Sequence, residues 1–259
     1  MLSFQRREQI KQMLIKQKSI TVTAVAEQFG VSDETIRRDL NVLSDEGFCN
    51  KTYGGAFLAT RSTSHIPQRM KKDLFVDEKR FMAKIAASFI RPKDCIFLDH
   101  STTVSELCHE IKSMSLTVVT NSLWVISELS DLENIDLVVT GGHCRTMDRG
   151  MFGQETLNFL NHHYFDKAFF SCRGLNIDNG IFDASEHTAS FHQALIDRAA
   201  ETFLMADHTK FGVAGFINIT SYSEIDNFIT DSQLDASWQE IFETNGVKVL
   251  NTLARDTQN

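Results

Sequence analysis

The sequence predicts a mixed α/β protein, in which an N-terminal winged helix-turn-helix is joined to a larger α/β domain with a mostly parallel sheet. Before residue 60, short amphipathic helices flank a glycine turn and a hairpin follows them. From residue 94 onward, short apolar strands alternate with amphipathic helices. A polar stretch that ends near Pro67 separates the two patterns. The expected boundaries are therefore 1–58 for the head, 59–75 for a linker and 76–259 for the body.

Composition and charge narrow the class of protein. The chain has 259 residues and a net charge of −8, yet residues 1–65 carry nine basic and seven acidic side chains, so the head is basic and the body acidic. Its apolar runs are far shorter than the ~20 residues of a membrane span, and the N-terminus has no signal-peptide pattern. Five cysteines without a CxxC pair favour a reducing cytoplasm, without disulfides or zinc.

The head is predicted to contain three helices. Residues 4–17 repeat apolar side chains at helical spacing, and residues 22–29 form a second apolar stripe that Thr21 can cap and Gly30 can end. Ser32 is placed to cap a third helix, whose apolar face is Ile36, Leu40 and Leu43. A hairpin around Gly54 and Gly55 should follow as the wing.

The third helix is the candidate DNA-recognition element, because its apolar stripe turns the arginines of its sequence TIRRDL away from the core. An ordinary solvated face is the alternative for an isolated Arg-Arg pair, but the surrounding helix-turn-helix and wing favour DNA. The DNA-contacting residues predicted on this basis are Ser32, Thr35, Arg37, Arg38, Asn41, Lys51 and Tyr53.

The body is predicted to bind a small anionic ligand at the ends of its strands. Asp99 to Thr103 follow an apolar strand and open a helix, so that backbone N–H groups of residues 101–104 and three hydroxyls can meet a phosphate. A second polar loop, Thr120 to Ser122, follows the next strand. Ligands of such sheets lie beyond the carboxyl ends of the strands. The alternative is that Ser101 or Thr102 only caps the helix.

Segments of both the head and the body resemble the sequences of a known protein family. VTAVAEQFGVSDETIRRDLNVLSDEGFCNKTYGGA is similar to the N-terminal segment of the DeoR family of bacterial transcription regulators. LDHSTT, VVTNSL, GGHCR, DKAFF, ADHTKFG and FITD extend the resemblance over nearly all of the body. The resemblance implies a repressor of carbohydrate metabolism that senses a phosphorylated sugar or related metabolite, with a body like ribose-5-phosphate isomerase.

The same resemblance implies the effector site. A phosphate cradle is expected at Ser101, Thr102 and Thr103, and the other expected effector-binding residues are Asp99, His100, Asn121, Gly141, Gly142, Arg145, Glu186, His192, Asp207 and Lys210. Four features depart from the family pattern: Tyr53 before the wing glycines, His100-Ser101 in the loop, Cys172-Arg173-Gly174 after a strand, and His192 in place of a lysine.

Other chemistry is less favoured by the sequence. His187 and His192 are five residues apart on a helix, so they face different sides, and no metal or other cofactor is expected. Asp183 and Glu186 read as polar loop residues or hydroxyl ligands rather than a proton-transfer pair. Lys71, Lys72, Lys79 and Arg80 read as a solvated helix face.

The expected function is thus a DNA-binding regulator without enzymatic activity, whose partners are double-stranded operator DNA, the effector and further copies of the chain in a homodimer or homotetramer. The rival function is an isomerase-like enzyme for phosphosugars with Asp99, Asp183 or Glu186 as base. A third is an adaptor whose head binds protein. The winged head argues for the regulator, because an isomerase does not need it.

Overall fold

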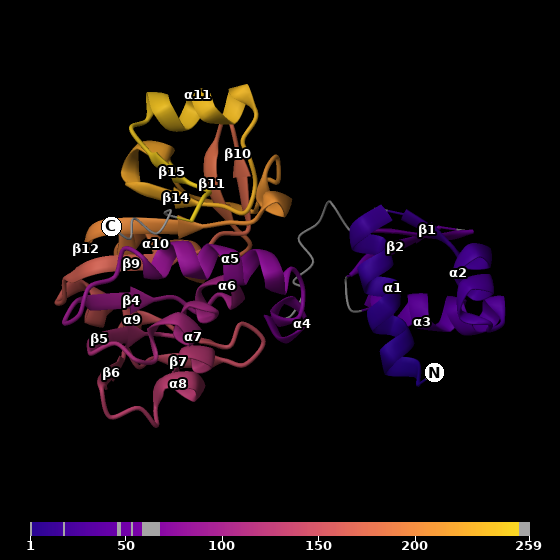
Figure 1. The fold of residues 1–259 in the computed structure, drawn as a ribbon, viewed down its shortest axis with the longest axis horizontal. Helices are drawn as coiled ribbons and strands as arrows, with labels where there is room; N and C mark the ends of the chain where they lie inside the picture. Colours follow the sequence, from indigo (N-terminus) through magenta and orange to yellow (C-terminus); the bar gives the residue numbers. More distant parts are fainter. Residues whose placement is uncertain (1, 18, 46–47, 53, 59–67, 254–259) are drawn as a thin grey trace, which may run out of the picture. The chain divides into compact units, whose positions relative to one another are not determined.

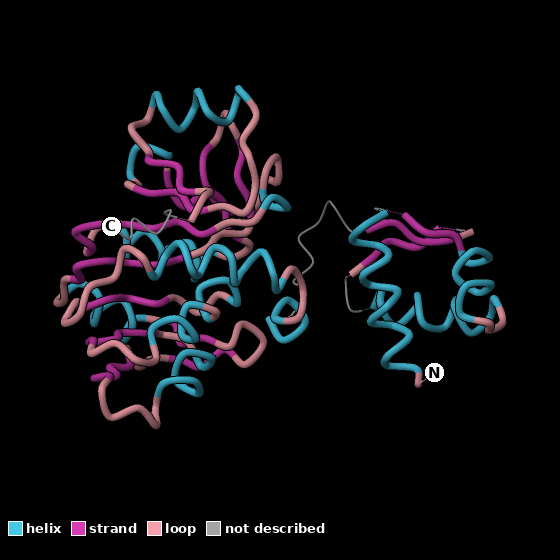
Figure 2. Tube along the Cα trace, viewed as in Figure 1, coloured by secondary structure: helices cyan, strands magenta, loops and turns pink. Residues whose placement is uncertain are grey.

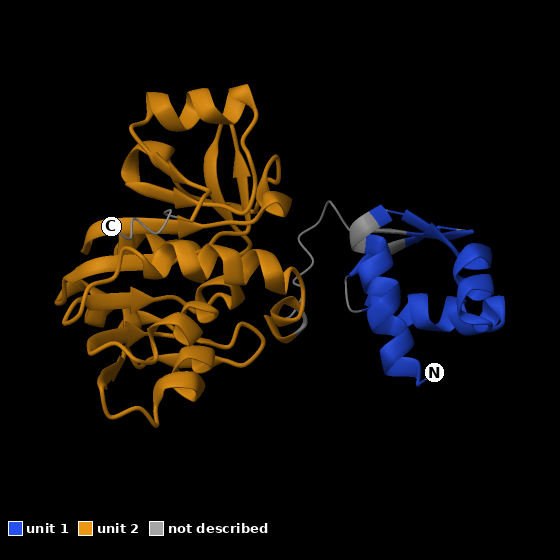
Figure 3. Ribbon diagram, viewed as in Figure 1, with its two compact units in different colours: residues 1–66 blue, residues 67–259 orange. Residues whose placement is uncertain are grey.

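The computed structural model describes residues 2–17, 19–45, 48–52, 54–58 and 68–253. The chain divides into two compact units, residues 1–66 and 67–259 (Figure 3). Each unit has its own sheets (Figures 1 and 2). Each also has its own buried apolar side chains. No helix within the described ranges combines the length and apolar character that a membrane crossing requires.

The first unit is a winged helix-turn-helix, as predicted. Its helices and strands are α1 (Ser3–Gln17), β1 (Ser19–Thr21), α2 (Val22–Phe29), α3 (Asp33–Asp45), β2 (Cys49–Thr52) and β3 (Gly55–Leu58). The three strands form an antiparallel sheet in the order β1-β3-β2. Gly55 lies in β3 where this strand pairs with β1. The position requires glycine, because a Cβ there would lie 2.0 Å from the carbonyl oxygen of Ile20.

The caps of the head confirm the sequence expectations. The Thr21 hydroxyl accepts a hydrogen bond from the N–H of Ala24, and Gly30 ends α2 in the left-handed region at a φ of 63°. The Ser32 hydroxyl accepts from the N–H of Thr35. Ile36, Leu40 and Leu43 are all buried against the rest of the head.

A buried ion pair, which the sequence did not reveal, joins α1 to α3. Asp39 is 3% exposed, and its carboxylate accepts a hydrogen bond from Nε of Arg6 at 2.5 Å. The second carboxylate oxygen lies 3.5 Å from a guanidinium nitrogen of Arg7. Asp39, the aspartate of TIRRDL, therefore holds the buried face of α3 against α1.

The second unit is built on a seven-stranded sheet in which every neighbouring pair is parallel, in the order β15-β14-β12-β9-β4-β5-β6. These strands are β4 (Cys95–Leu98), β5 (Leu116–Thr120), β6 (Ile135–Val139), β9 (Phe165–Phe170), β12 (Ala199–Met205), β14 (Asn227–Ile229) and β15 (Lys248–Leu250). The strand order runs outward in both directions from β4 and β9, so the topological switch point lies between them.

Helices cover both faces of this sheet. Alternate residues of β4 point to opposite sides, with Phe97 in one core and Ile96 and Leu98 in the other. One core includes side chains of α9 (Gln154–Asn161), α10 (Glu186–Ile196) and α11 (Ala236–Thr244), and the other includes those of α5 (Val76–Ala87), α7 (Leu107–Ile111) and α8 (Leu123–Leu129). Short α6 (Thr102–Ser105) follows β4 directly, in the core with α7.

Several short elements of the body were not predicted. They are the hairpin of β7 (His143–Arg145) and β8 (Gly150–Phe152), the strands β10 (Gly174–Asn176) and β11 (Gly180–Asp183), the helix α11, and the 3-10 turns His208–Lys210 and Tyr222–Glu224. β10 and β11 form a small antiparallel sheet with β13 (Ile217–Thr220). Strands of three or four residues carry too little periodicity to be recognised from sequence.

Lys71, Lys72, Lys79 and Arg80, which the sequence predicts on one helix face, in fact lie on two helices, α4 (Gln68–Lys72) and α5, with a turn at residues 73–75. Phe75 adopts a positive φ of 54° in this turn. The ammonium of Lys79 in α5 donates hydrogen bonds to the carbonyls of Lys71 and Lys72. Lys79 therefore caps the carboxyl end of α4, which explains why this lysine is buried rather than part of a solvated face.

Candidate functional site

The outer side of α3 carries the predicted DNA-contacting side chains. Arg37 and Arg38 are exposed, as are Ser32 and Asn41, while Thr35 is half-buried. The hydroxyls of Ser32 and Thr35 are 2.9 Å apart at the start of the helix. The Lys51 ammonium of β2 donates to the side-chain oxygen of Asn41 at 2.7 Å, so wing and recognition helix are joined. Tyr53 lies outside the described residues.

In the body, Asp99 occupies the switch point of the sheet. It follows β4, and its N–H donates to the carbonyl of Phe169 in β9. The carboxylate is fully buried and accepts hydrogen bonds from the N–H of Ser101 at 2.8 Å and of Ser171 at 3.0 Å. The carboxylate therefore connects the loops that follow the two strands where the strand order reverses.

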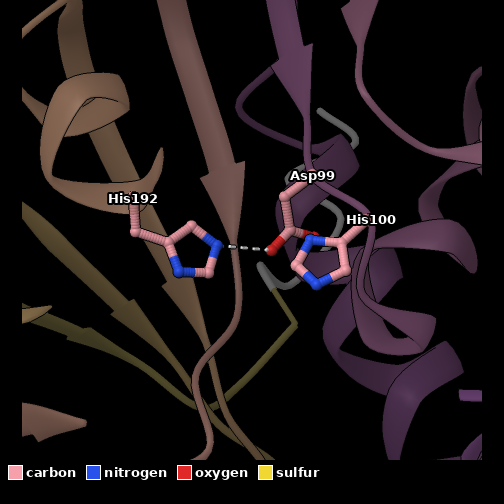
Figure 4. Close-up of side chains that lie close together, drawn as sticks. All are labelled: Asp99, His100 and His192. Carbon is pink, nitrogen blue, oxygen red and sulfur yellow. Dashed lines mark hydrogen bonds and ion pairs between the residues drawn. The ribbon is translucent and has the colours of Figure 1, made fainter. Parts of the chain in front are cut away.

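His192 of α10 lies between two carboxylates. Its Nε2 is 3.1 Å from Oδ2 of Asp99 (Figure 4), and its Nδ1 is 3.4 Å from Oδ2 of Asp183, close enough for an ion pair but not aligned as a hydrogen bond. Burial disfavours the charged ring, but Asp183 and Asp99 outweigh that cost and raise the pKa of His192 to about 9. Although burial opposes ionisation, His192 in turn holds the pKa values of both carboxyls below their usual range.

His100 packs beside this pair. Its ring stacks against that of His192 with centroids 6.0 Å apart, and it meets the edge of Phe152 at 4.9 Å. Only 5% of the residue is exposed, and burial lowers the pKa of its imidazole. Its Nδ1 is buried and has no hydrogen-bond partner among the described residues. Burial therefore favours the neutral form of the His100 ring, whose Nδ1 is left without a partner among the described residues.

The loop expected to hold a phosphate is buried and already uses part of its own hydrogen-bonding capacity. The Ser101 hydroxyl accepts from the N–H of Val104, and the N–H of Ser101 donates to Asp99. Within the described residues, no acceptor occurs for the N–H groups of Thr102 and Thr103. Two of the four donors expected from the sequence are thus satisfied internally, and two remain.

Buried polar atoms without a partner gather at this end of the body. Among the described residues, such atoms occur on six side chains: Gln68, His100, Asn121, Trp124, Arg149 and His192. They belong to α4, to the loops after β4 and β5, to the start of α8, to the β7–β8 hairpin and to α10, elements that meet beyond the carboxyl ends of the strands. Unsatisfied buried polar atoms are rare, so their concentration marks this end as a place for a polar ligand.

Positive charge is also concentrated there. Burial lowers the pKa of Lys71 in α4 to about 7, and the charges of Arg173 and Lys210 lower it further than the nearby carboxylates raise it. Lys210 lies 3.7 Å from the buried carboxylate of Asp207, whose own pKa is depressed, against the effect of burial, by Lys210 and Thr209. Lys210 is among the effector-binding residues predicted from the sequence, whereas Lys71 and Arg173 are not.

Other predicted site residues lie on the β7–β8 hairpin and at the start of α10. Arg145 is exposed and pairs with Asp148 at 2.9 Å, and His187 lies 3.3 Å from the same carboxylate. Glu186 and His187 line a surface cavity of about 370 Å³ beside Phe152 and Phe191.

Gly141 and Gly142 follow β6. The carbonyl of Gly141 accepts a hydrogen bond from the Thr156 hydroxyl at 2.8 Å. Asn121 after β5 donates to the carbonyl of Met151 and keeps its side-chain oxygen unpaired among the described residues.

Comparison with known proteins decides the family. The model of the DeoR-like helix-turn-helix domain matches residues 6–62, and that of the DeoR C terminal sensor domain matches residues 75–232. The chain belongs to the DeoR family of transcription regulators. Transcriptional regulators also appear among its relatives over nearly the whole length, and the two family models confirm the resemblance seen in the sequence.

The HTH-type transcriptional regulator YulB of Bacillus subtilis is 34% identical over 249 residues, which cover 96% of each chain. The glycerol-3-phosphate regulon repressor of Escherichia coli K12 is 28% identical and covers 95% of this DeoR-family chain and 97% of its own. Ribose 5-phosphate isomerase A of Methanocaldococcus jannaschii shows a partial likeness, with a TM-score of 0.39, 15% identity, and coverage of 52% of this chain and 54% of that one.

Proposed function

We propose that this DeoR-family regulator represses genes of carbohydrate metabolism and that a phosphorylated sugar or related metabolite controls its binding to operator DNA. The observation that carries the proposal is the cluster of unpaired buried polar atoms beyond the carboxyl ends of the strands, with Arg173 and Lys210 close enough to Lys71 to repel its charge. An anion would relieve that repulsion, and hydroxyl groups would satisfy unpaired atoms such as the side-chain oxygen of Asn121.

A panel of sugar phosphates, with the matching unphosphorylated sugars, tests the effector class by thermal shift. The correct ester at 100 times its Kd should stabilise the body by ~2.7 kcal/mol, which raises the Tm of a domain of this size by roughly 5–10 °C. Arg173→Met should lose most of this shift, because it removes a half-buried cation from the site. Equal shifts with the unphosphorylated sugars would contradict the proposed phosphate recognition.

Arg38→Ala should weaken operator binding and reduce its dependence on salt. Each lost phosphate contact lowers the slope of log K against log salt by ~0.9. Lys84→Ala is the matched control, because Lys84 is an exposed cation of the body and its loss changes the net charge equally. Fluorescence anisotropy over a salt series measures both quantities; a slope that Arg37→Ala and Arg38→Ala both leave unaltered would count against this docking.

The enzyme alternative predicts turnover. Incubation of the full-length chain with ribose 5-phosphate and similar esters should leave them unchanged if the protein is only a regulator. Isomer formation that Asp99→Asn abolishes would favour the alternative.

DNA half-sites are normally read by dimers, so we also expect a homodimer or homotetramer of the 29.3 kDa chain, which light scattering measures directly.

A further inference from the structure

Three buried side chains of the body place metal-ligating atoms close together. Asp99, His100 and His192 each offer one donor atom, and these atoms all lie within 4.8 Å of one another (Figure 4). The residues come from the loop after β4 and from α10, and none is more than 5% exposed. We propose that these three side chains bind a divalent transition-metal ion.

The distances and the donor types suit such an ion. In a tetrahedral site the ligand atoms lie ~2.0–2.2 Å from the metal, and the 3.1 Å between Oδ2 of Asp99 and Nε2 of His192 is compatible with two of those positions. Two imidazoles and one carboxylate are typical donors for Zn²⁺ or Fe²⁺, whereas Mg²⁺ prefers oxygen ligands. A small movement of the His100 ring would bring its donor nitrogen within bonding distance of the ion, as the third protein ligand.

The surroundings of the ligands are also those of a metal site. A histidine ligand usually directs its other ring nitrogen toward a carboxylate, and Nδ1 of His192 lies 3.4 Å from Oδ2 of Asp183. The Asp99 carboxylate is held by the N–H groups of Ser101 and Ser171. Two ligands are therefore oriented by groups outside the proposed coordination sphere.

His100 supplies an independent reason for a ligand. Its Nδ1 is buried without a hydrogen-bond partner among the described residues, while the aromatic rings of Phe152 and Phe191 surround the imidazole. A buried unsatisfied nitrogen is costly, and coordination within this cluster would account for a histidine in an otherwise aromatic setting. Three protein ligands leave a coordination position for a water or an effector oxygen.

The rival arrangement has no metal, and His192 is simply a cation shared between Asp99 and Asp183. To separate the two, the full-length protein is stripped with a chelator and titrated by calorimetry with ZnCl₂, with MgCl₂ as the negative control. Anaerobic Fe²⁺ forms a second arm. CoCl₂ reports coordination through its visible d–d absorption. We expect one Zn²⁺ or Fe²⁺ per chain, intense Co²⁺ bands and no heat with Mg²⁺.

Variants locate the ion. His100→Phe keeps a buried ring of similar size and should weaken Zn²⁺ binding by more than about 100-fold, and Asp183→Asn should weaken it by ~10–100-fold. His143→Ala and Cys144→Ser are controls, because both residues are exposed on β7 and should leave the affinity unchanged. Circular dichroism of each variant checks the fold, and His192→Gln provides a second ligand variant if His100→Phe misfolds.

The proposal is overturned if the wild-type protein binds none of the ions, or if a folded His100→Phe or His192→Gln variant binds Zn²⁺ as tightly as the wild type. DNA binding and the response to sugar phosphates are measured on the same samples. Because both are also measured on the metal-stripped protein, a failure of this inference is distinguishable from a failure of the proposed regulatory function.

Discussion

Asp39→Ala is expected to unfold the DNA-binding head and abolish operator binding. The substitution leaves the guanidinium of Arg6, a residue that is only 8% exposed, without its buried partner. Removing one member of a buried pair costs ~3–5 kcal/mol. Domains of about 60 residues bury little surface, so their stability is of the same order as this loss.

Amide hydrogen exchange on the full-length protein measures the effect. Protection across α1 and α3 should be lost in Asp39→Ala and kept in the body, because the two units have separate cores. Arg7→Ala is the matched control, since its side chain is 28% exposed and it lies further from Asp39, at 3.5 Å. Arg6→Met combined with Asp39→Leu should recover part of the protection. Native protection in Asp39→Ala would show that the pair does not hold the head together.

Periodicity explains why so much of the fold could be predicted. The burial of Ile36, Leu40 and Leu43 follows from helical spacing alone, and β5 has the limits that its apolar run LTVVT gives. The polar loops after β4 and β5 could also be placed together, because parallel neighbours end at one edge of a sheet.

The missing parts depend on contacts between distant segments. Asp39 looks in sequence like another charge of a polar helix, and only its pairing with Arg6 shows that it is buried. His192 lies 93 residues from Asp99, so spacing within its own helix could not reveal its partner. Lys71 belongs to a lysine-rich stretch that favours a solvated face, but Arg173 and Lys210 surround its charge only after the sheet has formed.

The charge of Lys71 makes a second large effect testable: the affinity for a phosphorylated effector should fall as the pH rises above 7. In the free protein, burial first and then the charges of Arg173 and Lys210 lower the pKa of Lys71 to about 7. A bound anion favours the charged ammonium and raises that pKa, so binding takes up a proton. The affinity is therefore highest below pH 7 and declines by up to about tenfold per pH unit above it, until the pKa of the complex is reached.

Calorimetry between pH 7 and 9 isolates this effect, because a phosphate monoester with a second pKa of about 6 is already a dianion there. Lys71→Met should bind more weakly at pH 7 and lack most of the decline. Lys72→Met is the matched control, because the Lys72 ammonium lies over the ring of Trp124, 4.3 Å from its centroid. This variant should keep the fall in affinity with rising pH. A decline that persists in Lys71→Met would assign the proton uptake to another group, with Lys79 the first to test because its pKa is lowered by burial to about 8. A wild-type affinity that is constant over this range would remove Lys71 from the effector site, because a cation that gains a phosphate partner must hold its proton more tightly.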